Sequence, residues 1–327
     1  MFALLRLLGD GAFHSGEGMA KQLGVSRASV NNALREAEDF GLTLYRVRGR
    51  GYCLAEPPQW LDHGGVVRCL GTRGSEFDLV ILDSAHSTNT LLMREMTEGA
   101  ASGRVLAVEW QSAGRGRMGR KWYSALGSGL TFSLLWRFDC GLGALSGLSL
   151  AVGVALIRAL RGLGIESAQL KWPNDVLDER GAKLAGVLIE AQGEMLGPSA
   201  VVIGIGLNLS LPRYVSQLIG RPAAGLTEMH DKVPDRNQLL AALLLALGDI
   251  LREFGEYGFA ALCQEWERHH AFQDRPVRIS LPDSSQLVGI ARGVTDEGAL
   301  TLETDGTMQI LHAGDISLTA EMKHAVA

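Results

Sequence analysis

The 327-residue sequence is poor in cysteine and aromatic residues and has no excess of basic charge. Its four cysteines lie far apart without a C-x-x-C pair, which excludes a zinc knuckle and a disulfide framework and predicts a reducing, cytoplasmic location. The formal net charge is −5, so any affinity for nucleic acid must come from a local basic face. Because no uncharged apolar run reaches the ~20 residues that span a bilayer, we expect no membrane contact.

Apolar residues make up 46% of the chain, enough to build substantial cores in two or three domains. The composition and the positions of proline and glycine residues predict an α+β protein with three domains, at residues 1–60, 66–271 and 272–327. Pro57 and Pro58 mark the first boundary.

Residues 3–40 have the pattern of three short helices, with Ser15 and Ser26 as N-caps and Gly24 at the turn between the second and third. A hairpin with a basic tip follows at 42–54, so the sequence predicts a winged helix-turn-helix. In such a domain, the second helix of the helix-turn-helix is the recognition helix, which contacts the DNA bases, and the wing contacts phosphates. The residues expected to contact DNA are Ser26, Arg27, Asn31, Asn32, Arg35, Arg48 and Arg50.

The middle of the chain alternates strand-like and helix-like segments, which predicts a mixed α/β domain. Strands are expected at 77–82, 105–110, 129–136, 184–190 and 201–209, and helices at 144–163 and 236–254. After Pro276 only short strand signals separated by turns remain, and they predict a small β-barrel.

The segment 111–122 places four cations among three glycines, directly after a predicted strand and without any acid. Glycine lets the backbone approach a polyanion closely, and guanidinium groups bind phosphate oxygens in pairs. The segment therefore predicts a site for a triphosphate or acyl phosphate, although a solvated basic loop is the alternative. Its glycines also spell G-x-G-x-x-G, but the residues that follow are strand-like, which argues against dinucleotide binding.

Three further candidates lie downstream. Pro173 excludes an ordinary central strand and leaves Asn174 and Asp175 at a turn where they can address Mg²⁺ or a ribose, although a plain surface turn fits equally well. Lys183 opens an apolar strand and can hold a carboxylate beside a phosphate, although most such lysines face solvent. Asn208 follows a glycine-rich strand and is the weakest candidate.

Taken together, these pieces resemble the biotin protein ligase family, and the winged-helix start is most similar to its bifunctional ligase and biotin-operon-repressor subtype. The likeness covers almost the whole chain and follows the family's motif order. The motifs are Ser87-Thr88-Asn89, 114–122 (GRGRMGRKW), 171–175 (KWPND), 183–186 (KLAG) and 204–208 (GIGLN).

The resemblance implies a role for each matching residue. Biotin would be bound by Ser87, Thr88, Asn89, Gln111, Gly114, Arg115, Arg117 and Lys183. ATP would be bound by Arg117, Arg120, Asn174, Asp175, Asn208 and Arg292. Arg117, Arg120 and Lys183 would be catalytic, and Asp175 would bind the metal. Unlike the family's closest members, residues 209–225 contain no tryptophan to cover the adenylate; Tyr214 is the one aromatic residue there.

The resemblance also implies the activity: biotin, ATP and Mg²⁺ give biotinoyl-AMP, from which biotin passes to a lysine of a biotin carboxyl carrier protein. The adenylate-bound form would dimerise and repress transcription at operator DNA. The implied architecture is a winged helix-turn-helix, a mixed α/β ligase domain and an SH3-like C-terminal barrel. The alternatives are a lipoate-type ligase and a non-catalytic, metabolite-sensing repressor, and the cation cluster and the KWPND run favour a biotin ligase over both.

Overall fold

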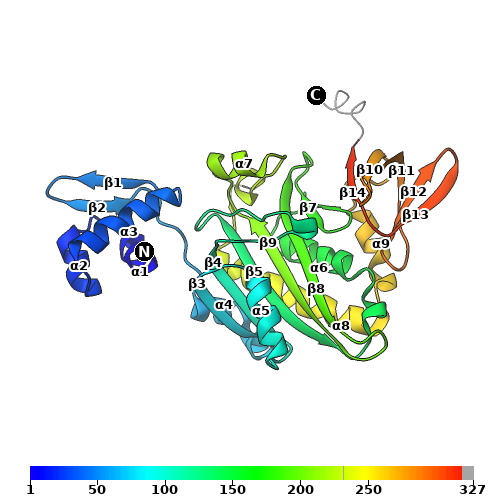
Figure 1. Ribbon diagram of the computed structural model, residues 1–327, viewed down its shortest axis with the longest axis horizontal. Helices are drawn as coiled ribbons and strands as arrows, with labels where there is room; N and C mark the ends of the chain where they lie inside the picture. Colours follow the sequence, from blue (N-terminus) through cyan, green and yellow to red (C-terminus); the bar gives the residue numbers. More distant parts are fainter. Residues whose placement is uncertain (231, 319–327) are drawn as a thin grey trace.

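The computed structural model describes residues 1–230 and 232–318 of the chain. The N-terminal part is the predicted winged helix-turn-helix, with its own small apolar core (Figure 1). Backbone N–H groups of the second and third helices donate to the Ser15 and Ser26 hydroxyls at 3.0 Å, so both predicted caps are confirmed. Its elements are α1 (Phe2–Leu7), η1 (Leu8–Asp10), α2 (Gly16–Leu23), α3 (Arg27–Asp39), β1 (Leu44–Val47) and β2 (Gly51–Leu54).

A seven-stranded sheet with the order β3-β4-β5-β9-β8-β7-β6 forms the centre of the molecule. Only the β3–β4 pair is parallel among the described neighbours. The five predicted strands are confirmed, and the short β6 and β7 add to them. The strands are β3 (Asp78–Ala85), β4 (Arg104–Gln111), β5 (Gly129–Phe138), β6 (Gln169–Lys171), β7 (Asp175–Leu177), β8 (Lys183–Gly193) and β9 (Ser199–Asn208).

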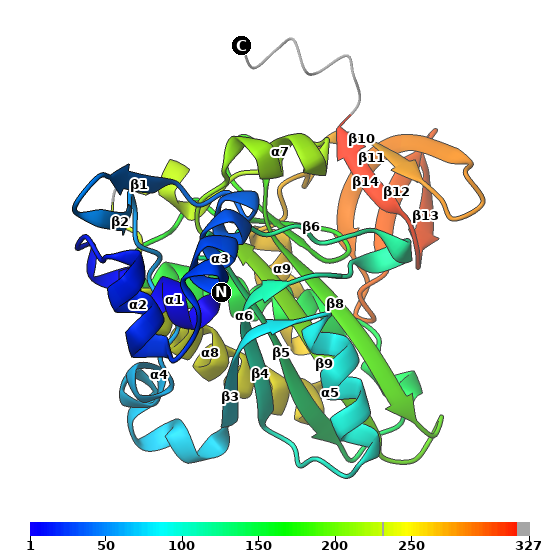
Figure 2. The same cartoon turned by 60° about the vertical axis from the view of Figure 1, so that its left-hand side comes forward.

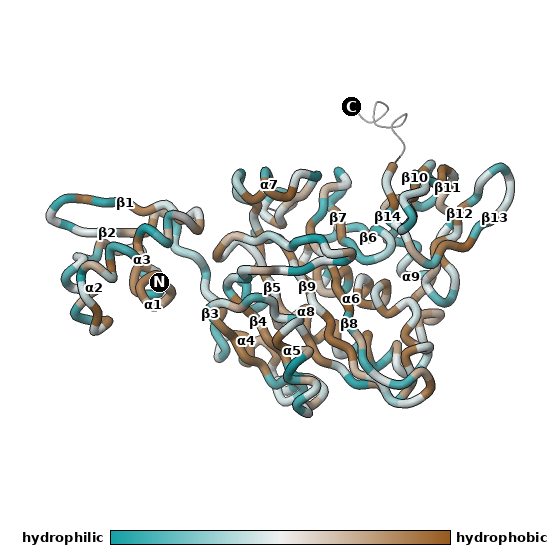
Figure 3. Tube along the Cα trace, in the orientation of Figure 1, coloured by the Kyte–Doolittle hydropathy of each residue, from teal (hydrophilic) through white to brown (hydrophobic). Residues whose placement is uncertain are grey.

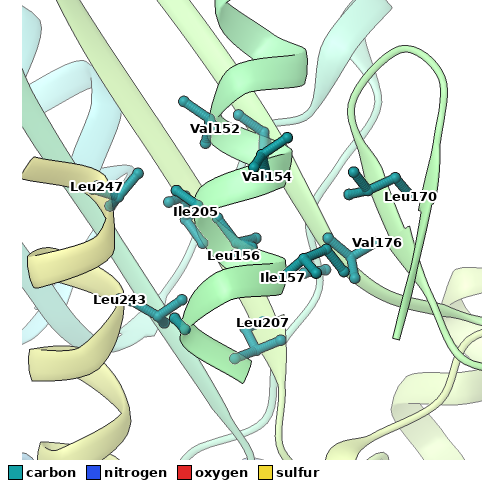
Figure 4. Packing of buried hydrophobic residues seen from close by; sticks show 14 of the residues in the cluster. Val152, Val154, Leu156, Ile157, Leu170, Val176, Ile205, Leu207, Leu243 and Leu247 are labelled. Atoms are coloured by element: carbon teal, nitrogen blue, oxygen red, sulfur yellow. The ribbon is translucent and has the colours of Figure 1, made fainter. Parts of the chain in front are cut away.

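Helices cover both faces of this sheet because its strands alternate apolar residues between them. In β4, Val105 and Ala107 join the main core with α6 (Leu148–Gly162) and α8 (Arg236–Tyr257), while Leu106 joins a second cluster under α5 (Thr88–Thr97). Figure 4 shows side chains of α6 packed between α8 and β9, and Figure 3 shows hydrophobic segments in and around both helices. The helix predicted over 144–163 begins at Leu148, preceded by η4 (Leu142–Leu145).

The C-terminal domain is the predicted small β domain, a five-stranded antiparallel sheet with the order β13-β12-β11-β10-β14. Its buried side chains belong to the same apolar cluster as the central domain, and Trp172 Nε1 donates to Gly298 O at 3.1 Å across the contact. Its strands are β10 (Pro276–Ser280), β11 (Gln286–Val294), β12 (Leu300–Thr304), β13 (Thr307–Leu311) and β14 (Asp315–Leu318). The remaining elements are α4 (His63–Leu70), η2 (Gly71–Glu76), η3 (Arg117–Gly119), α7 (Arg213–Ile219), η5 (Leu226–Glu228) and α9 (Ala260–Arg268).

A fully buried ion pair fastens the linker after the winged helix to the central domain. Arg236, the first residue of α8, donates to Glu109 of β4 at 2.6 Å, and their side chains are 1% and 0% exposed. The Leu61 N–H donates to the other Glu109 oxygen at 2.6 Å, and Arg236 also donates to the Gln59 carbonyl at 2.6 Å. The pair therefore satisfies linker backbone groups as well as its own charges.

The winged helix contacts the central domain just after α3. The Phe40 ring packs edge-on against Trp110 of β4, with centroids 4.6 Å apart. Tyr214 of α7 donates from its hydroxyl to the Phe40 carbonyl at 2.9 Å. Gly41 has φ +81°, and a Cβ there would meet the Tyr214 ring at 2.4 Å, so the close approach requires glycine. Figure 2 brings this side of the molecule forward. Within the described residues, no helix has the length and apolar character needed to cross a membrane.

We expect Arg236→Met to lower the free energy of unfolding by about 3–5 kcal/mol, because it leaves Glu109 charged and unpaired in the core. Urea unfolding followed by circular dichroism measures the loss. Arg94→Met is the matched control, since it breaks an exposed helix pair with Glu98 and should cost less than about 1 kcal/mol. Equal losses in the two variants would contradict the importance of the buried pair.

Candidate active site

A cavity of about 780 Å³ lies on the sheet face opposite α6 and α8, beside the start of α5. The glycine-rich loop 114–122 and strands β8 and β9 complete its wall. Ten residues predicted from the sequence line this one cavity: Ser87, Thr88, Asn89, Gln111, Arg115, Arg117, Arg120, Asn174, Asp175 and Lys183.

Glycines on the neighbouring strands β8 and β9 make room for this cavity, as the β9 glycines illustrate. In β9, Ile205 and Leu207 point into the main core, so Gly204 and Gly206 between them face the cavity. A Cβ on Gly206 would lie 2.3 Å from the Trp122 ring, and one on Gly204 would lie 2.1 Å from the Asn89 side chain. The alternation thus builds a core on one face and an open floor on the other.

Uncharged hydrogen-bonding groups gather at the start of α5. The Thr88 N–H donates to the Gln111 side-chain oxygen at 2.7 Å. Ser133 Oγ lies 2.7 Å from Thr88 Oγ1 and 2.6 Å from Asn89 Oδ1, and Ser87 caps the helix. Because these buried groups carry no net charge, this end of the cavity suits a neutral polar ligand group.

The glycine-rich loop folds back as a tight hairpin. The Gly116 N–H donates to Arg120 O at 2.7 Å, and the Trp122 N–H donates to Gly114 O at 2.9 Å. At the tip, Met118 adopts φ +55°. The chain then enters β5 rather than a helix, so the prediction that this is no dinucleotide-binding fingerprint is confirmed.

Three of the six cations that line the cavity have a carboxylate partner. Lys183 pairs with Asp175, Arg115 pairs with Glu190 at 2.5 Å, and Arg120 pairs with Asp315 at 2.7 Å. Burial lowers the pKa of Lys183 below its ordinary value, and the Asp175 carboxylate opposes that effect.

Arg117 is different. It donates to Asn174 Oδ1 at 3.3 Å and, within residues 1–230 and 232–318, has no carboxylate within ion-pair distance. Burial lowers the pKa of its guanidinium, which means that the charged form is poorly solvated. A half-buried cation without a counter-ion is a natural partner for an anionic ligand.

Three predicted residues do not line the main cavity. Gly114 stands behind it, where a Cβ would lie 2.6 Å from Trp122 O. Asn208 lines an adjoining space of about 370 Å³. Arg292 pairs with Asp274 and Glu303, at 2.7 Å each, and lines neither space. These two pairs hold its guanidinium on the C-terminal domain, and the expected contact with ATP stays a prediction.

Sequence reasoning missed several residues that line or support the cavity. Asp315 enters from the C-terminal domain, Arg221 lies on the wall common to the two spaces, and Glu190 holds Arg115. Trp122 was part of a motif without a role, and its buried Nε1 has no hydrogen-bond partner in the described residues. Only Trp122 had a sequence signal, its place beside the cation cluster.

Three family models match the chain in order. The HTH domain matches residues 1–53, the Biotin/lipoate A/B protein ligase family matches 81–208, and the Biotin protein ligase C terminal domain matches 274–319. The bifunctional ligase/repressor BirA of Escherichia coli is 38% identical over 321 residues, which are 98% of this chain and 97% of that protein. The chain belongs to the biotin protein ligase family.

Other members of the biotin protein ligase family are also similar to this chain. The bifunctional ligase/repressor BirA of Bacillus subtilis is 30% identical over 94% of both chains. The solved biotin protein ligase of Aquifex aeolicus, in complex with biotin and ATP, has a TM-score of 0.60 and 27% identity, covering 73% of this chain and 97% of that one. The fold predicted from the sequence, an N-terminal helix-turn-helix followed by ligase and β-rich domains, is confirmed.

In this biotin protein ligase family member, we expect Gly206→Ala to lower the free energy of unfolding by about 1–3 kcal/mol, because the new methyl group must displace Trp122. The urea midpoint measures the loss. Gly162→Ala is the control, since its Cβ would meet nothing within 4 Å and its backbone is helical. A Gly206→Ala protein as stable as the Gly162→Ala protein would refute the close contact with Trp122.

Proposed function

We propose that this chain uses ATP to convert biotin to biotinoyl-AMP and then transfers biotin to a lysine of a biotin carboxyl carrier protein. The observation that carries the proposal is Arg117, a half-buried cation without a carboxylate partner, in the same cavity as the buried Lys183. Similarity to bifunctional BirA proteins over nearly the whole chain supports it.

The two ends of the cavity suit the two reactants. Thr88, Asn89 and Gln111 offer neutral donors and acceptors that match an uncharged polar ring such as that of biotin, and Trp122 offers an apolar wall. Arg117 and Lys183 then lie where a carboxylate meets a phosphate. Arg115, whose side chain is held by its ion pair with Glu190, lies beside both ends of the cavity.

In the first step, a biotin carboxylate oxygen attacks the α-phosphorus of ATP, a P–O bond forms, and pyrophosphate leaves. Arg117, Arg120 and Lys183 stabilise the negative charge that develops on the phosphate oxygens. In the second step, the acceptor lysine amine attacks the carbonyl carbon of the mixed anhydride; an amide bond forms, AMP leaves and the amine proton is released. Both steps need positioning and charge stabilisation more than a covalent enzyme intermediate.

Mg²⁺ would enter with the nucleotide. The described residues contain no group of three or more potential His, Cys, Asp or Glu ligands, and Mg²⁺ commonly binds through one or two carboxylates together with substrate phosphates. Asp175 lines the cavity beside Asn174 and is the carboxylate that would contact the ion, while Asn208 lines the adjoining space where the nucleotide could extend. Bound there, Mg²⁺ would neutralise phosphate charge.

The winged helix supports a second role, repression at operator DNA by an adenylate-bound homodimer. Arg27, Asn32 and Arg35 are exposed on α3, and Arg48 and Arg50 are exposed on the wing. Ser26 is occupied as the N-cap, and Asn31 accepts a hydrogen bond from Tyr52 at 3.3 Å, so these two are less available for base contacts. An acidic chain with few cations on this face needs two copies for firm binding.

The four cysteines are free thiols, which fits the proposed cytoplasmic location.

The alternatives fit less well. The family model over 81–208 covers biotin and lipoate ligases alike, but the full-length relatives are biotin-type and share the C-terminal domain. A repressor that only senses a neutral metabolite would have no use for Arg117 and Lys183 in a buried cavity.

We predict that Arg117→Ala and Lys183→Ala each slow biotinoyl-AMP formation by about 10²-fold or more, because developing charge loses a preorganised cation. Mass spectrometry of single-turnover mixtures with ATP and either biotin or lipoate measures the adenylate. Arg94→Ala, an exposed helix variant, is the control. A wild-type rate in both cavity variants, or a lipoyl adenylate in preference to the biotinoyl one, would refute the proposal.

We predict that biotinoyl-AMP increases both the dimer fraction in sedimentation and the affinity for a duplex selected from a random library. At fixed salt, Arg48→Ala should weaken binding to all duplexes and reduce the salt slope by about 1, whereas Asn32→Ala should relax base preference. Arg68→Ala, exposed on α4, is the control. If the adenylate changes neither oligomeric state nor DNA affinity, the repressor role is wrong and the ligase role stands.

A further inference from the structure

Asp315, at the start of β14, brings the C-terminal domain to the main cavity. Asp315 and the preceding Gly314 are the described residues of that domain that line it. The Arg120 guanidinium lies 2.7 Å from one Asp315 oxygen, and Lys171 Nζ lies 3.2 Å from the other. One carboxylate therefore bridges the glycine-rich loop and the strand that precedes the 172–174 turn.

The docking of the C-terminal domain does not need this charge. Ile279 and Ile316 are buried in the shared apolar core, and Trp172, itself 1% exposed, donates to Gly298 O. Gly314 lies under Ile279, where a Cβ would come within 2.9 Å, so the backbone turn that presents Asp315 is set by packing. The carboxylate is then free to serve the cavity.

The bridge fixes two long side chains that would otherwise be mobile. Burial raises the pKa of Asp315, but Lys171 and Arg120 outweigh burial and hold it below the ordinary value, so the carboxylate is charged at neutral pH. Free lysine and arginine side chains lose considerable rotamer entropy when a ligand immobilises them. Here that entropy is already lost before any ligand binds.

We propose that Asp315 is a positioning residue for the triphosphate: it holds Arg120 and Lys171 at the cavity wall in the ATP-free protein. The inference rests on the proposed function. Two cations around one carboxylate retain a net charge of +1, so the group still attracts phosphate, while Arg117, which has no carboxylate within ion-pair distance in the described residues, contacts it directly. The C-terminal domain thereby contributes to ATP binding through an acid.

The test compares Asp315→Asn with Asp315→Glu in steady-state pyrophosphate release, with ATP and biotin varied in turn. Asp315→Asn should raise the KM for ATP about tenfold, equivalent to about 1.4 kcal/mol, and leave the KM for biotin unchanged. Asp315→Glu keeps the charge and should restore most of the loss. Asp283→Asn is the matched control, because Asp283 is an exposed acid of the same domain that accepts hydrogen bonds from Ser285 and lies outside the cavity.

A double-variant cycle separates positioning from a general structural effect. Because Asp315 acts through the two cations, Asp315→Asn should raise the KM for ATP by less in an Arg120→Met or Lys171→Met background than in the wild type. An unchanged or lower KM for ATP in Asp315→Asn, an equal rise in those backgrounds, or a parallel rise for biotin with a lower urea midpoint would each overturn the inference. A wild-type protein that releases no pyrophosphate would instead overturn the proposed function.

Discussion

The buried pair between Glu109 and Arg236 is the constraint on which the arrangement of the three parts depends. A charge in a dry core is costly unless it is paired, and here both charges are paired and also bond to the linker backbone; of the polar atoms of the pair, Arg236 Nε alone has no partner in the described residues. The next residues of the same strand continue the connection. Trp110 packs against Phe40 of the winged helix, and Gln111 accepts from Thr88 at the cavity. Three consecutive residues of β4 thus hold the linker, the DNA-binding domain and the neutral end of the active site.

The second constraint is the period of two in the central sheet. Alternate residues of each strand supply apolar side chains to the core under α6 and α8. The residues between them face the other side of the sheet, where the cavity lies. Glycine at 204 and 206 weakens a strand, but in β9 both flanking strands pair with it along its length, so the local cost is offset. The same alternation leaves little side chain at the strand positions that face the cavity, so the arginines that line it come from the glycine-rich loop and from the segment 209–225.

Local signals in the sequence were enough to predict much of this. The caps at Ser15 and Ser26, the long strands and the cation loop are read from neighbouring residues. The family resemblance alone supplied Ser87, Thr88, Asn89 and Gln111, which line the same cavity as the residues of the cation loop. What could not be predicted depends on residues far apart in the chain. Glu109 and Arg236 are 127 positions apart, and Asp315 gives no signal of its own in the sequence. Arg292 was placed by family likeness alone, without knowledge that Asp274 and Glu303 bind it.

The segment 209–225 connects the chemistry to the winged helix. Its Arg221 lines the cavity, and its backbone at Pro222 and Ala224 hydrogen-bonds to the backbone of Lys183. Tyr214, in the same segment, lies against Phe40 and Gly41 and does not line the cavity. A ligand that orders this segment can move the winged helix only if the contact between Tyr214 and Phe40 differs between the free and bound states. If the adenylate strengthens DNA binding through this contact, reciprocity requires that DNA strengthen adenylate binding by the same factor.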